Sequence, residues 1–326
     1  MPSRPAWQER KAKTEARAEF VMAISCIACD SADCALLGAL PVFTEDFLGQ
    51  PKSTPAEAGS MYRCRNCHLH FRFPAATAEV LAAYYRGLSS EDWWQHGSDR
   101  EVWQEIKQDL RQLPEQTVLD VGCFRGDFLN FLGPEWQRFG IEPSSDARRA
   151  AESRGISIIG STIESLPEDD QQFGAITLID VIEHLPQPMR ALDKLQARLQ
   201  PGGKLIIFTG NTGAWSWRLA GVNYWYSGMP EHVAFFCPEW FAWAAPKLRC
   251  RVSSSRLLRY EPAGLRTRID EALKNIAFVT YRRFVQFPGL EKVMTRLPVI
   301  KQIGRWESCW WTSARDHMLV VLTKEM

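Results

Sequence analysis

A glycine turn between two short apolar segments is the feature that most constrains the fold of this chain. Residues 117–121 have the apolar, β-branched character of a buried strand, and Gly122 and Gly126 follow them. Glycines let the backbone turn sharply and approach a ligand without a Cβ in the way. A second apolar segment ends at Glu142, whose carboxylate can accept hydrogen bonds from ribose hydroxyls. With a helix beginning near Arg125, which would offer free N–H groups to an anionic group, the stretch predicts half of a mononucleotide-binding unit.

Short apolar segments alternate with segments of helical periodicity from residue 117 onward. This alternation predicts an α/β fold: a Rossmann-like, doubly wound, mostly parallel seven-stranded sheet covered on both faces. The expected strands are 117–121, 138–142, 157–159, 175–179, 204–209, 252–260 and 318–323. The expected helices are 126–132, 145–153, 188–198 and 238–245.

Two later segments give the glycine turn a context. Residues 174–186 read GAITLIDVIEHLP, and residues 199–209 read LQPGGKLIIFT. In this order and at these spacings, the segments closely resemble class I S-adenosylmethionine-dependent methyltransferases, over roughly residues 115–260 and the last ten residues. The resemblance implies S-adenosyl-L-methionine as cofactor, with its amino-acid end over the glycine turn. The cofactor-binding residues that it implies are Asp120, Gly122, Phe124, Gly126, Glu142, Thr162, Ile163 and Asp180.

Phe124 departs from the family pattern, which usually has glycine at this point. A phenyl ring here either crowds the cofactor or packs under the following helix, so that only its backbone faces the ligand. We expect the second arrangement because the flanking glycines are present. A further departure is that Ser161 and Thr162 offer no acid where the family usually prefers one near the adenine.

A second motif, Pro230-Glu231-His232, lies after the fifth strand, where methyltransferases of this fold build the acceptor pocket. It resembles the Glu-His-x-x-x-Phe segment of methyltransferases that act on sugars and other small metabolites. In sugar C-methyltransferases with an N-terminal zinc module, the corresponding Glu-His and a nearby tyrosine take part in proton transfer. A hydroxyl acceptor must lose its proton, and histidine has a suitable pKa. We therefore predict His232 as general base, with Glu231, Tyr224 and Tyr226 as further catalytic residues.

The alternative for His232 is a structural histidine whose hydrogen bonds are satisfied within the fold. A separate pair, Glu183 and His184, follows Asp180. In the resembling family this pair is mostly structural, and we expect a role at the start of a helix.

Two Cys-x-x-Cys pairs indicate a metal site. Four thiolates form the tetrahedral set that zinc prefers, and such a closed set leaves no open position, so we expect a structural zinc ion. Cys34, His68 and His70 could each replace one ligand, and the alternative is four unrelated buried cysteines. The predicted ligands are Cys26, Cys29, Cys64 and Cys67.

The predicted organisation has four parts and one insertion. Residues 1–20 are a polar leader, 21–74 a small zinc-ribbon-like module, 75–113 a helical linker and 114–326 the methyltransferase domain. Before the last strand lies an insertion at residues 261–313, where related proteins commonly have a short hairpin.

The insertion has apolar residues at three- and four-residue steps, which predicts at least one amphipathic helix, and its basic residues outnumber its acidic ones. We favour a lid or dimer element whose apolar face is core. The alternative is peripheral contact with an anionic membrane surface, at the inner membrane face.

Net charge, hydropathy and the cysteine pattern bear on the partners and the location of the protein. A formal net charge of +1 gives no case for a nucleic-acid partner. The sequence has neither an apolar run of about 18 residues nor a secretory signal, and its paired cysteines fit a reducing compartment, so we expect a cytoplasmic protein. The sequence does not predict the oligomeric state.

Several functions compete. We prefer methyl transfer to a hydroxyl of a small-molecule or carbohydrate acceptor, such as a glycan or nucleotide-sugar, with C-methylation of a keto-sugar close behind. An NAD-linked nucleotide-sugar oxidoreductase would explain the glycine turn and Glu142, but Phe124 breaks the Gly-x-Gly-x-x-Gly fingerprint. A non-catalytic zinc-ribbon adaptor would need a degenerate cofactor pocket.

Overall fold

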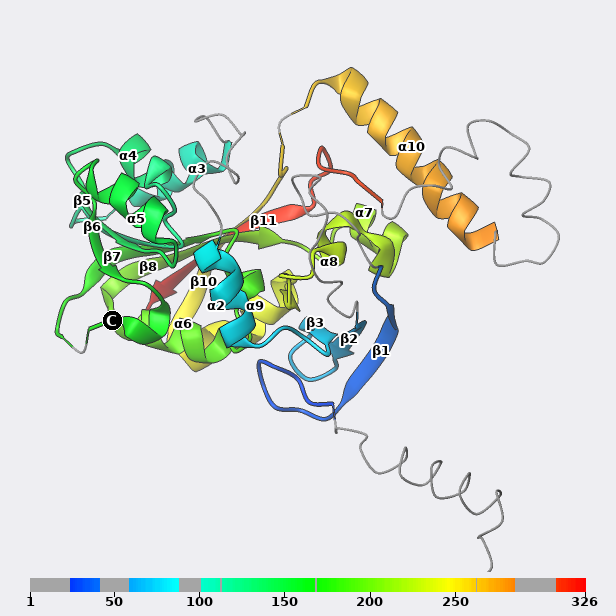
Figure 1. Ribbon diagram of the computed structural model, residues 1–326, viewed down its shortest axis with the longest axis horizontal. Helices are drawn as coiled ribbons and strands as arrows, with labels where there is room; N and C mark the ends of the chain where they lie inside the picture. Colours follow the sequence, from blue (N-terminus) through cyan, green and yellow to red (C-terminus); the bar gives the residue numbers. More distant parts are fainter. Residues whose placement is uncertain are drawn as a thin grey trace, which may run out of the picture.

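The chain folds around two β-sheets, a large one and a small one (Figure 1). The structure is a computed structural model that describes residues 24–41, 59–87, 101–111, 113–167, 169–261, 263–284 and 309–326. The predicted leader at residues 1–20 lies outside these ranges, as does the part of the insertion from 285 to 308.

The large sheet has seven strands in the order β10-β11-β8-β7-β4-β5-β6. Strands β6, β5, β4, β7 and β8 are parallel to one another, and β11 is antiparallel to both β8 and β10. The predicted α/β fold with a mostly parallel seven-stranded sheet is therefore confirmed. The strands are β4 (Thr117–Val121), β5 (Gln137–Ile141), β6 (Ser157–Gly160), β7 (Phe173–Ile179), β8 (Leu199–Gly210), β10 (Cys250–Leu258) and β11 (His317–Lys324).

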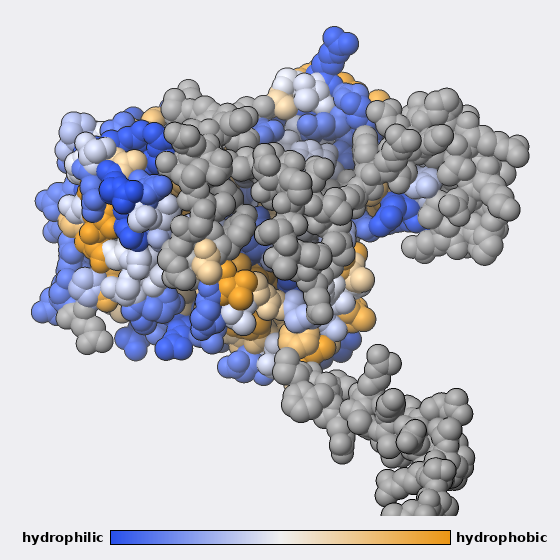
Figure 2. Space-filling view, in the orientation of Figure 1, coloured by the Kyte–Doolittle hydropathy of each residue, from blue (hydrophilic) through white to orange (hydrophobic). Residues whose placement is uncertain are grey.

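Helices cover both faces of this sheet. On one face, α6 (Pro188–Ala197) and α9 (Pro238–Ala244) contribute Leu192, Leu195 and Trp240 to a buried apolar cluster. On the other face, α3 (Glu101–Leu110), α4 (Asp127–Leu132) and α5 (Ser145–Glu152) contribute to a second cluster. Hydrophilic residues prevail on the outer surface at the α4 and α5 end, as expected of helices that bury one side only (Figure 2).

The sheet has a topological switch point at β4. The chain runs from β4 outward to β5 and β6 on one side, and then returns to β7 and β8 on the other. In open α/β sheets, ligands bind in the crevice outside the carboxyl ends of the strands at such a point. Gly122, Glu142 and Asp180 directly follow the strands β4, β5 and β7, and all three therefore lie at this edge.

The small sheet joins the N-terminal module to the large domain. Its strands β1 (Cys34–Ala39), β2 (Ser60–Cys64) and β3 (His70–Phe73) are antiparallel, and β9 (Ala234–Phe235) adds a fourth strand beside β3. Strand β9 directly follows the predicted acceptor motif. The first apolar cluster also includes Cys26, Phe71 and Ala234, so the module and the large domain share one core.

Helices α2 (Ala78–Gly87) and α3 lie in the segment predicted to be a helical linker. The domain boundaries proposed from the sequence stay a prediction, because the shared core gives no sharp border at residue 74.

A third apolar cluster gathers the aromatic residues of the C-terminal half. It includes residues of α7 (Trp215–Ala220), the 3₁₀ turn η3 (Gly221–Asn223), α8 (Trp225–Gly228) and the loop at residues 309–314. Helix α10 (Leu265–Phe284) packs on this cluster through Phe278 and Val279, and it stands away from the large sheet (Figure 1). A helix in the insertion is thus confirmed. No helix among the described residues is long and apolar enough to cross a membrane.

Candidate active site

A cavity of about 720 Å³ opens at the switch point of the large sheet. Its wall joins two groups of residues that the sequence singled out separately. One group surrounds the glycine turn after β4, and the other surrounds the Glu231-His232 motif. A donor bound on the turn and an acceptor beside the motif would therefore share one space. The predicted cofactor residues on its wall are Asp120, Gly122, Phe124, Glu142, Thr162, Ile163 and Asp180.

The two glycines of the turn are required by their surroundings. Gly122 has φ of +72°, and a Cβ there would lie 2.7 Å from Val181 Cγ2. Gly126 has φ of +74°, and a Cβ there would lie 2.0 Å from Ile156 Cδ1. Both conformations favour glycine, and both positions lack room for a side chain. Gly126 itself is not on the cavity wall.

Phe124 adopts φ of +48°, the left-handed region in which glycine is favoured. This explains why the resembling family usually has glycine here. The Phe124 N–H donates to Glu142 Oε2 at 2.9 Å, which joins the turn to the end of β5. Phe124 is half-buried and lines the cavity, and it is not among the side chains packed beneath α4. The expectation that its ring packs under the helix is therefore not met.

Glu142 is held in place by the backbone. Its Oε1 accepts the Ser144 N–H at 2.7 Å, and its Oε2 accepts the Phe124 N–H. Burial raises the pKa of Glu142, although these two N–H groups favour its ionised form. Each oxygen has a second lone pair, so the carboxylate can still accept bonds from a ligand hydroxyl. The geometry fits the ribose-binding role that the resemblance implies.

Asp120 is a buried acid with one strong partner. Thr177 Oγ1 donates to its Oδ1 at 2.6 Å, and no ion pair with Asp120 is found among the described residues. Burial raises the pKa of Asp120 to about 7, with a smaller contribution in the same direction from the nearby charge of Glu142. A cationic ligand in the cavity would favour the ionised form of this acid. S-adenosyl-L-methionine carries both a sulfonium and an ammonium group, so Asp120 fits such a cofactor.

The wall near the expected adenine position contains an acid after all. Thr162 and Ile163 line the cavity as predicted, and Glu164, which is exposed, lines it beside them. Ser161 and Thr162 themselves offer no acid. The 3₁₀ turn η1 (Ile163–Ser165) brings the acid to the cavity two positions later.

His232 is buried and points one ring nitrogen at the backbone. Its Nδ1 lies 2.8 Å from the carbonyl oxygen of Tyr226, which can only accept, so Nδ1 carries the proton and Nε2 keeps its lone pair. Burial lowers the pKa of His232 well below its ordinary value, so the ring is neutral at pH 7. The residue lines the cavity, and its ring packs against His184 with centroids 4.7 Å apart. This arrangement can accept a proton from a bound hydroxyl.

Tyr226 belongs to a buried network that includes Glu183, for which the sequence predicted only a structural role. Its hydroxyl donates to Glu183 Oε1 at 2.5 Å, and Thr209 Oγ1 donates to Glu183 Oε2 at 2.9 Å. Burial and the charge of Glu183 raise the pKa of Tyr226 well above its ordinary value, and burial raises the pKa of Glu183. Tyr226 and Glu183 both line the cavity, so this network forms part of the acceptor side.

His184 has more partners than a residue that only starts a helix. Its Nδ1 lies 2.7 Å from the hydroxyl of Tyr85 on α2 and 3.1 Å from the carbonyl oxygen of Glu231. One ligand atom each of Glu183, His184 and His232 lie within 4.8 Å of one another, a set that could also hold a cation.

The two remaining predicted catalytic residues differ in position. Glu231 is buried and lines the cavity beside His232. Tyr224 is not on the cavity wall, and its hydroxyl donates to Asp316 Oδ2 at 2.7 Å. It belongs to the aromatic cluster beneath α7. Tyr224 therefore lies away from the cavity in which an acceptor would bind.

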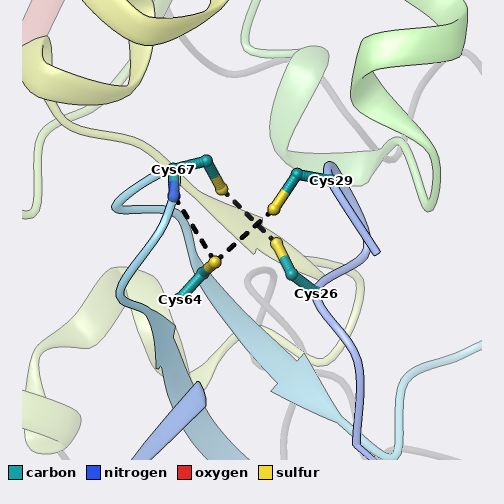
Figure 3. A group of neighbouring side chains, drawn as sticks. All are labelled: Cys26, Cys29, Cys64 and Cys67. Atoms are coloured by element: carbon teal, nitrogen blue, oxygen red, sulfur yellow. Dashed lines mark hydrogen bonds between the residues drawn. The ribbon is translucent and has the colours of Figure 1, made fainter. Parts of the chain in front are cut away.

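The four predicted metal ligands come together in the N-terminal module (Figure 3). The Cys26 and Cys67 sulfurs are 3.5 Å apart, as are those of Cys29 and Cys64, and all four thiols are free. A tetrahedral zinc ion with bonds of about 2.3 Å needs sulfurs separated by about 3.8 Å. These two distances, with all four sulfurs within 4.8 Å of one another, are compatible with a zinc ion.

The two cysteine pairs are held by similar turns. The Asp30 N–H donates to the Cys26 carbonyl at 2.9 Å, and the His68 N–H donates to the Cys64 carbonyl at 3.1 Å. Asp30 and His68 both have positive φ. Cys34, His68 and His70, which the sequence offered as possible replacements for one ligand, do not belong to the four-cysteine set. The Nδ1 of His70 lies 3.2 Å from Thr212 Oγ1 instead.

Comparison with known proteins gives one family match. Residues 94–250 match the family model described as a methyltransferase domain. A ubiquinone biosynthesis O-methyltransferase from Serratia proteamaculans is 29% identical over 139 residues, which cover 38% of this chain and 58% of that protein. A probable tRNA methyltransferase 9B from Bos taurus is 29% identical over 134 residues, which cover 40% of this chain and 27% of that protein. The chain therefore spans less than two thirds of the length of either relative.

Solved structures of similar fold include a SAM-dependent methyltransferase from Thermotoga maritima. The superposition has a TM-score of 0.44 at 17% sequence identity, and it includes 69% of this chain and 89% of the Thermotoga maritima chain.

Proposed function

We propose that this chain is a class I S-adenosylmethionine-dependent methyltransferase that methylates a hydroxyl group of a small-molecule or carbohydrate acceptor, with His232 as general base. The match of residues 94–250 to a methyltransferase domain supports the first part of the proposal. The observation that carries the proposal is the state of His232. It is neutral, its Nδ1 proton is committed to a backbone carbonyl, and it lines the same cavity as the cofactor residues. A ubiquinone biosynthesis O-methyltransferase among the relatives also supports a hydroxyl acceptor.

The residues of the chain would divide the work between positioning and proton removal. When bound, S-adenosyl-L-methionine supplies an electrophilic methyl group with a good leaving group. Glu142 would hold the ribose hydroxyls, and Asp120 would favour the cationic end of the cofactor. The acceptor then needs alignment with the methyl group, and its hydroxyl needs to lose a proton. His232 Nε2 would accept that proton.

Tyr226 and Glu183 support this step from the neighbouring wall. Their short hydrogen bond fixes the tyrosine ring 4.2 Å from the His232 ring, centroid to centroid. We propose that this contact orients the base, and that Glu231 binds a further hydroxyl of the acceptor. Aromatic and apolar side chains around them suit a flat or ring-shaped acceptor. These side chains are Tyr85, Trp225, Met229 and Tyr260.

The test is methyl transfer itself. Zinc-loaded protein is incubated with S-adenosyl-L-methionine and a panel of catechols, phenols, nucleotide-sugars and a keto-sugar, and S-adenosylhomocysteine formation is measured. We expect one hydroxyl class to be methylated, and we expect His232→Ala to lower kcat by about 10²- to 10⁴-fold while the Kd for S-adenosylhomocysteine stays unchanged. A fully active His232→Ala variant would remove His232 as base. Turnover of the keto-sugar alone would favour C-methylation.

A bound cation is an alternative to a free histidine base. If Glu183, His184 and His232 held a divalent cation, mild chelation that leaves the cysteine-bound zinc in place would stop turnover, and Mg²⁺ or Mn²⁺ would restore it. A turnover rate that chelation does not change would support His232 as the base.

Helix α10 supports a second proposal, which concerns where the enzyme meets its acceptor. Its outer face exposes Leu265 (69%), Ile269 (51%), Leu273 (64%) and Ile276 (44%), at steps of three and four residues. The opposite face is anchored, since Phe278 is fully buried and Asn275 Nδ2 donates to the Trp310 carbonyl at 2.7 Å. The helix thus presents an apolar stripe although it is packed on the fold.

Charge around this stripe favours an anionic lipid surface as its partner. Arg266, Arg268 and Arg283 belong to the same helix, which has five basic and two acidic residues. Basic side chains around an apolar stripe are typical of helices that lie in the headgroup region. The helix also begins a few residues after Glu261, on the cavity wall. We propose that α10 rests on an anionic membrane with the cavity close to that surface.

Vesicle binding tests this second proposal. The full chain should sediment with phosphatidylglycerol-containing vesicles and less with pure phosphatidylcholine. The double variant Ile269→Glu/Leu273→Glu should lose this binding, whereas Val252→Glu, an exposed apolar site on β10, should keep it. Absence of binding by the parent protein, or a change of oligomeric state in the double variant, would instead indicate a protein contact.

A further inference from the structure

Arg72 is a buried arginine that the zinc module inserts into the acceptor side of the large domain. It lies on β3 and is only 2% exposed. Its guanidinium donates to three backbone carbonyls, those of Ser227 at 2.8 Å, Met229 at 2.9 Å and His232 at 3.1 Å. The Arg72 backbone N–H donates to the Val233 carbonyl at 3.0 Å. All four acceptors belong to residues 227–233.

This segment has little regular structure of its own. Helix α8 ends at Gly228 and β9 begins at Ala234, and between them the chain carries the Glu231-His232 motif. Buried carbonyls without partners are costly, and in this segment three of them find the same side chain. A guanidinium offers five N–H groups in a planar fork, which can reach several carbonyls at once, whereas a lysine ammonium is a compact group on a flexible stem.

The positive charge of Arg72 also acts on the base. Arg72 is one of the groups that lower the pKa of His232, after burial and the charge of His184. His317 acts in the same direction, and the Tyr226 carbonyl acts against it. Burial lowers the pKa of Arg72 itself to about 10, so its side chain is protonated at neutral pH. Arg72 therefore helps to keep His232 neutral.

We propose that Arg72 is a positioning residue, which holds residues 227–233 so that His232 faces the cofactor end of the cavity. This inference rests on the proposed function. It assigns the zinc module a part in turnover: a zinc ion held by the four cysteines would order the turns beside β2 and β3, and β3 supplies the arginine that fixes the base. Arg72 itself does not line the cavity.

The experiment compares Arg72→Lys and Arg72→Met with the parent chain, all zinc-loaded. We expect kcat to fall by about 10- to 100-fold in both variants, as when a reacting group is misplaced by about 1 Å. Zinc content and the Kd for S-adenosylhomocysteine should stay unchanged. Arg63→Met is the matched control, because Arg63 lies on β2 of the same sheet and is exposed, and its kcat should equal that of the parent.

A pH profile separates positioning from simple stabilisation. Without the arginine charge, the pKa of His232 should rise, so the acidic limb of kcat should move to higher pH in Arg72→Met and less in Arg72→Lys. A parent-like kcat and pH profile in Arg72→Met would overturn the proposal. So would loss of zinc or cofactor binding in both variants, because Arg72 would then be a folding residue. If the parent chain methylates no acceptor, the proposed function fails together with this inference. If Arg72→Met is as active as the parent while His232→Ala is inactive, only the role of Arg72 is refuted.

Discussion

Replacing Asp120 by asparagine should stabilise the cofactor-free protein while it weakens cofactor binding. Asp120 is buried at the end of β4, and its pKa is raised from 3.8 to about 7. The folded chain therefore holds a proton between about pH 4 and pH 7 that the unfolded chain has released. Stability falls with rising pH wherever the folded state binds more protons, so the free energy of unfolding should decrease through this window and level off above it.

The size of the effect follows from the shift. The pKa of Asp120 lies about three pH units above its ordinary value, and each unit corresponds to about 1.4 kcal/mol, so ionised Asp120 costs about 4 kcal/mol at pH 8. Asparagine removes this cost and can still accept the Thr177 hydroxyl. If its buried amide N–H groups find no acceptor, they reduce the free energy of unfolding by about 1–3 kcal/mol. We expect a net gain of about 1–3 kcal/mol at pH 8.

Urea unfolding of the cofactor-free, zinc-loaded protein measures this gain. The advantage of Asp120→Asn should shrink by about 1.4 kcal/mol for each pH unit below pH 7. Asp146→Asn is the control, since Asp146 is half exposed on α5 and should change stability by less than about 0.5 kcal/mol. Titration with S-adenosyl-L-methionine should show weaker binding to Asp120→Asn. An Asp120→Asn variant that is less stable than its parent at pH 8 would refute the reasoning.

Three further predictions concern the cofactor site, the zinc module and the acceptor side. Glu142→Gln turns one acceptor into a donor that faces a backbone N–H, so it should weaken S-adenosylhomocysteine binding by about 1–3 kcal/mol, measured by calorimetry; equal affinity would mean that the turn is misassigned. Cys26→Ser should release zinc and unfold the small sheet, measured by metal analysis and circular dichroism, and zinc-free parent protein would contradict the site. Tyr226→Phe should lower kcat and destabilise the fold by about 1–3 kcal/mol, because Glu183 loses a buried donor; an unchanged kcat would exclude the network from turnover.

The strands of the large sheet were predictable because each is an apolar run between turn residues. Strand β4 has the predicted ends, while β8 begins at Leu199, five residues before the predicted 204. The extra residues include Pro201, Gly202 and Gly203, which read as a turn and lie at an irregularity in the pairing with β7, between the paired residues Leu199 and Lys204. The cofactor residues came from the resemblance, and the structure places all but Gly126 on the cavity wall.

The acceptor side was less predictable because long-range contacts decide it. Tyr224 and Tyr226 are two positions apart and look equivalent in the sequence, but Tyr224 precedes α8 and bonds to Asp316, 92 residues away. Arg72 and His232 are separated by 160 residues, and no local pattern links them. The structural role predicted for Glu183 came from the family resemblance, and its hydrogen bonds to Thr209 and Tyr226, 26 and 43 residues away, have no local sequence signal.

The central claim is that the switch point of the large sheet binds an adenosyl sulfonium donor, and calorimetric titration of the zinc-loaded chain tests it most directly. We predict saturable heat from S-adenosyl-L-methionine and from S-adenosylhomocysteine, with one site per chain, and none from NAD. Heat from NAD alone, or from none of the three ligands, would contradict the account.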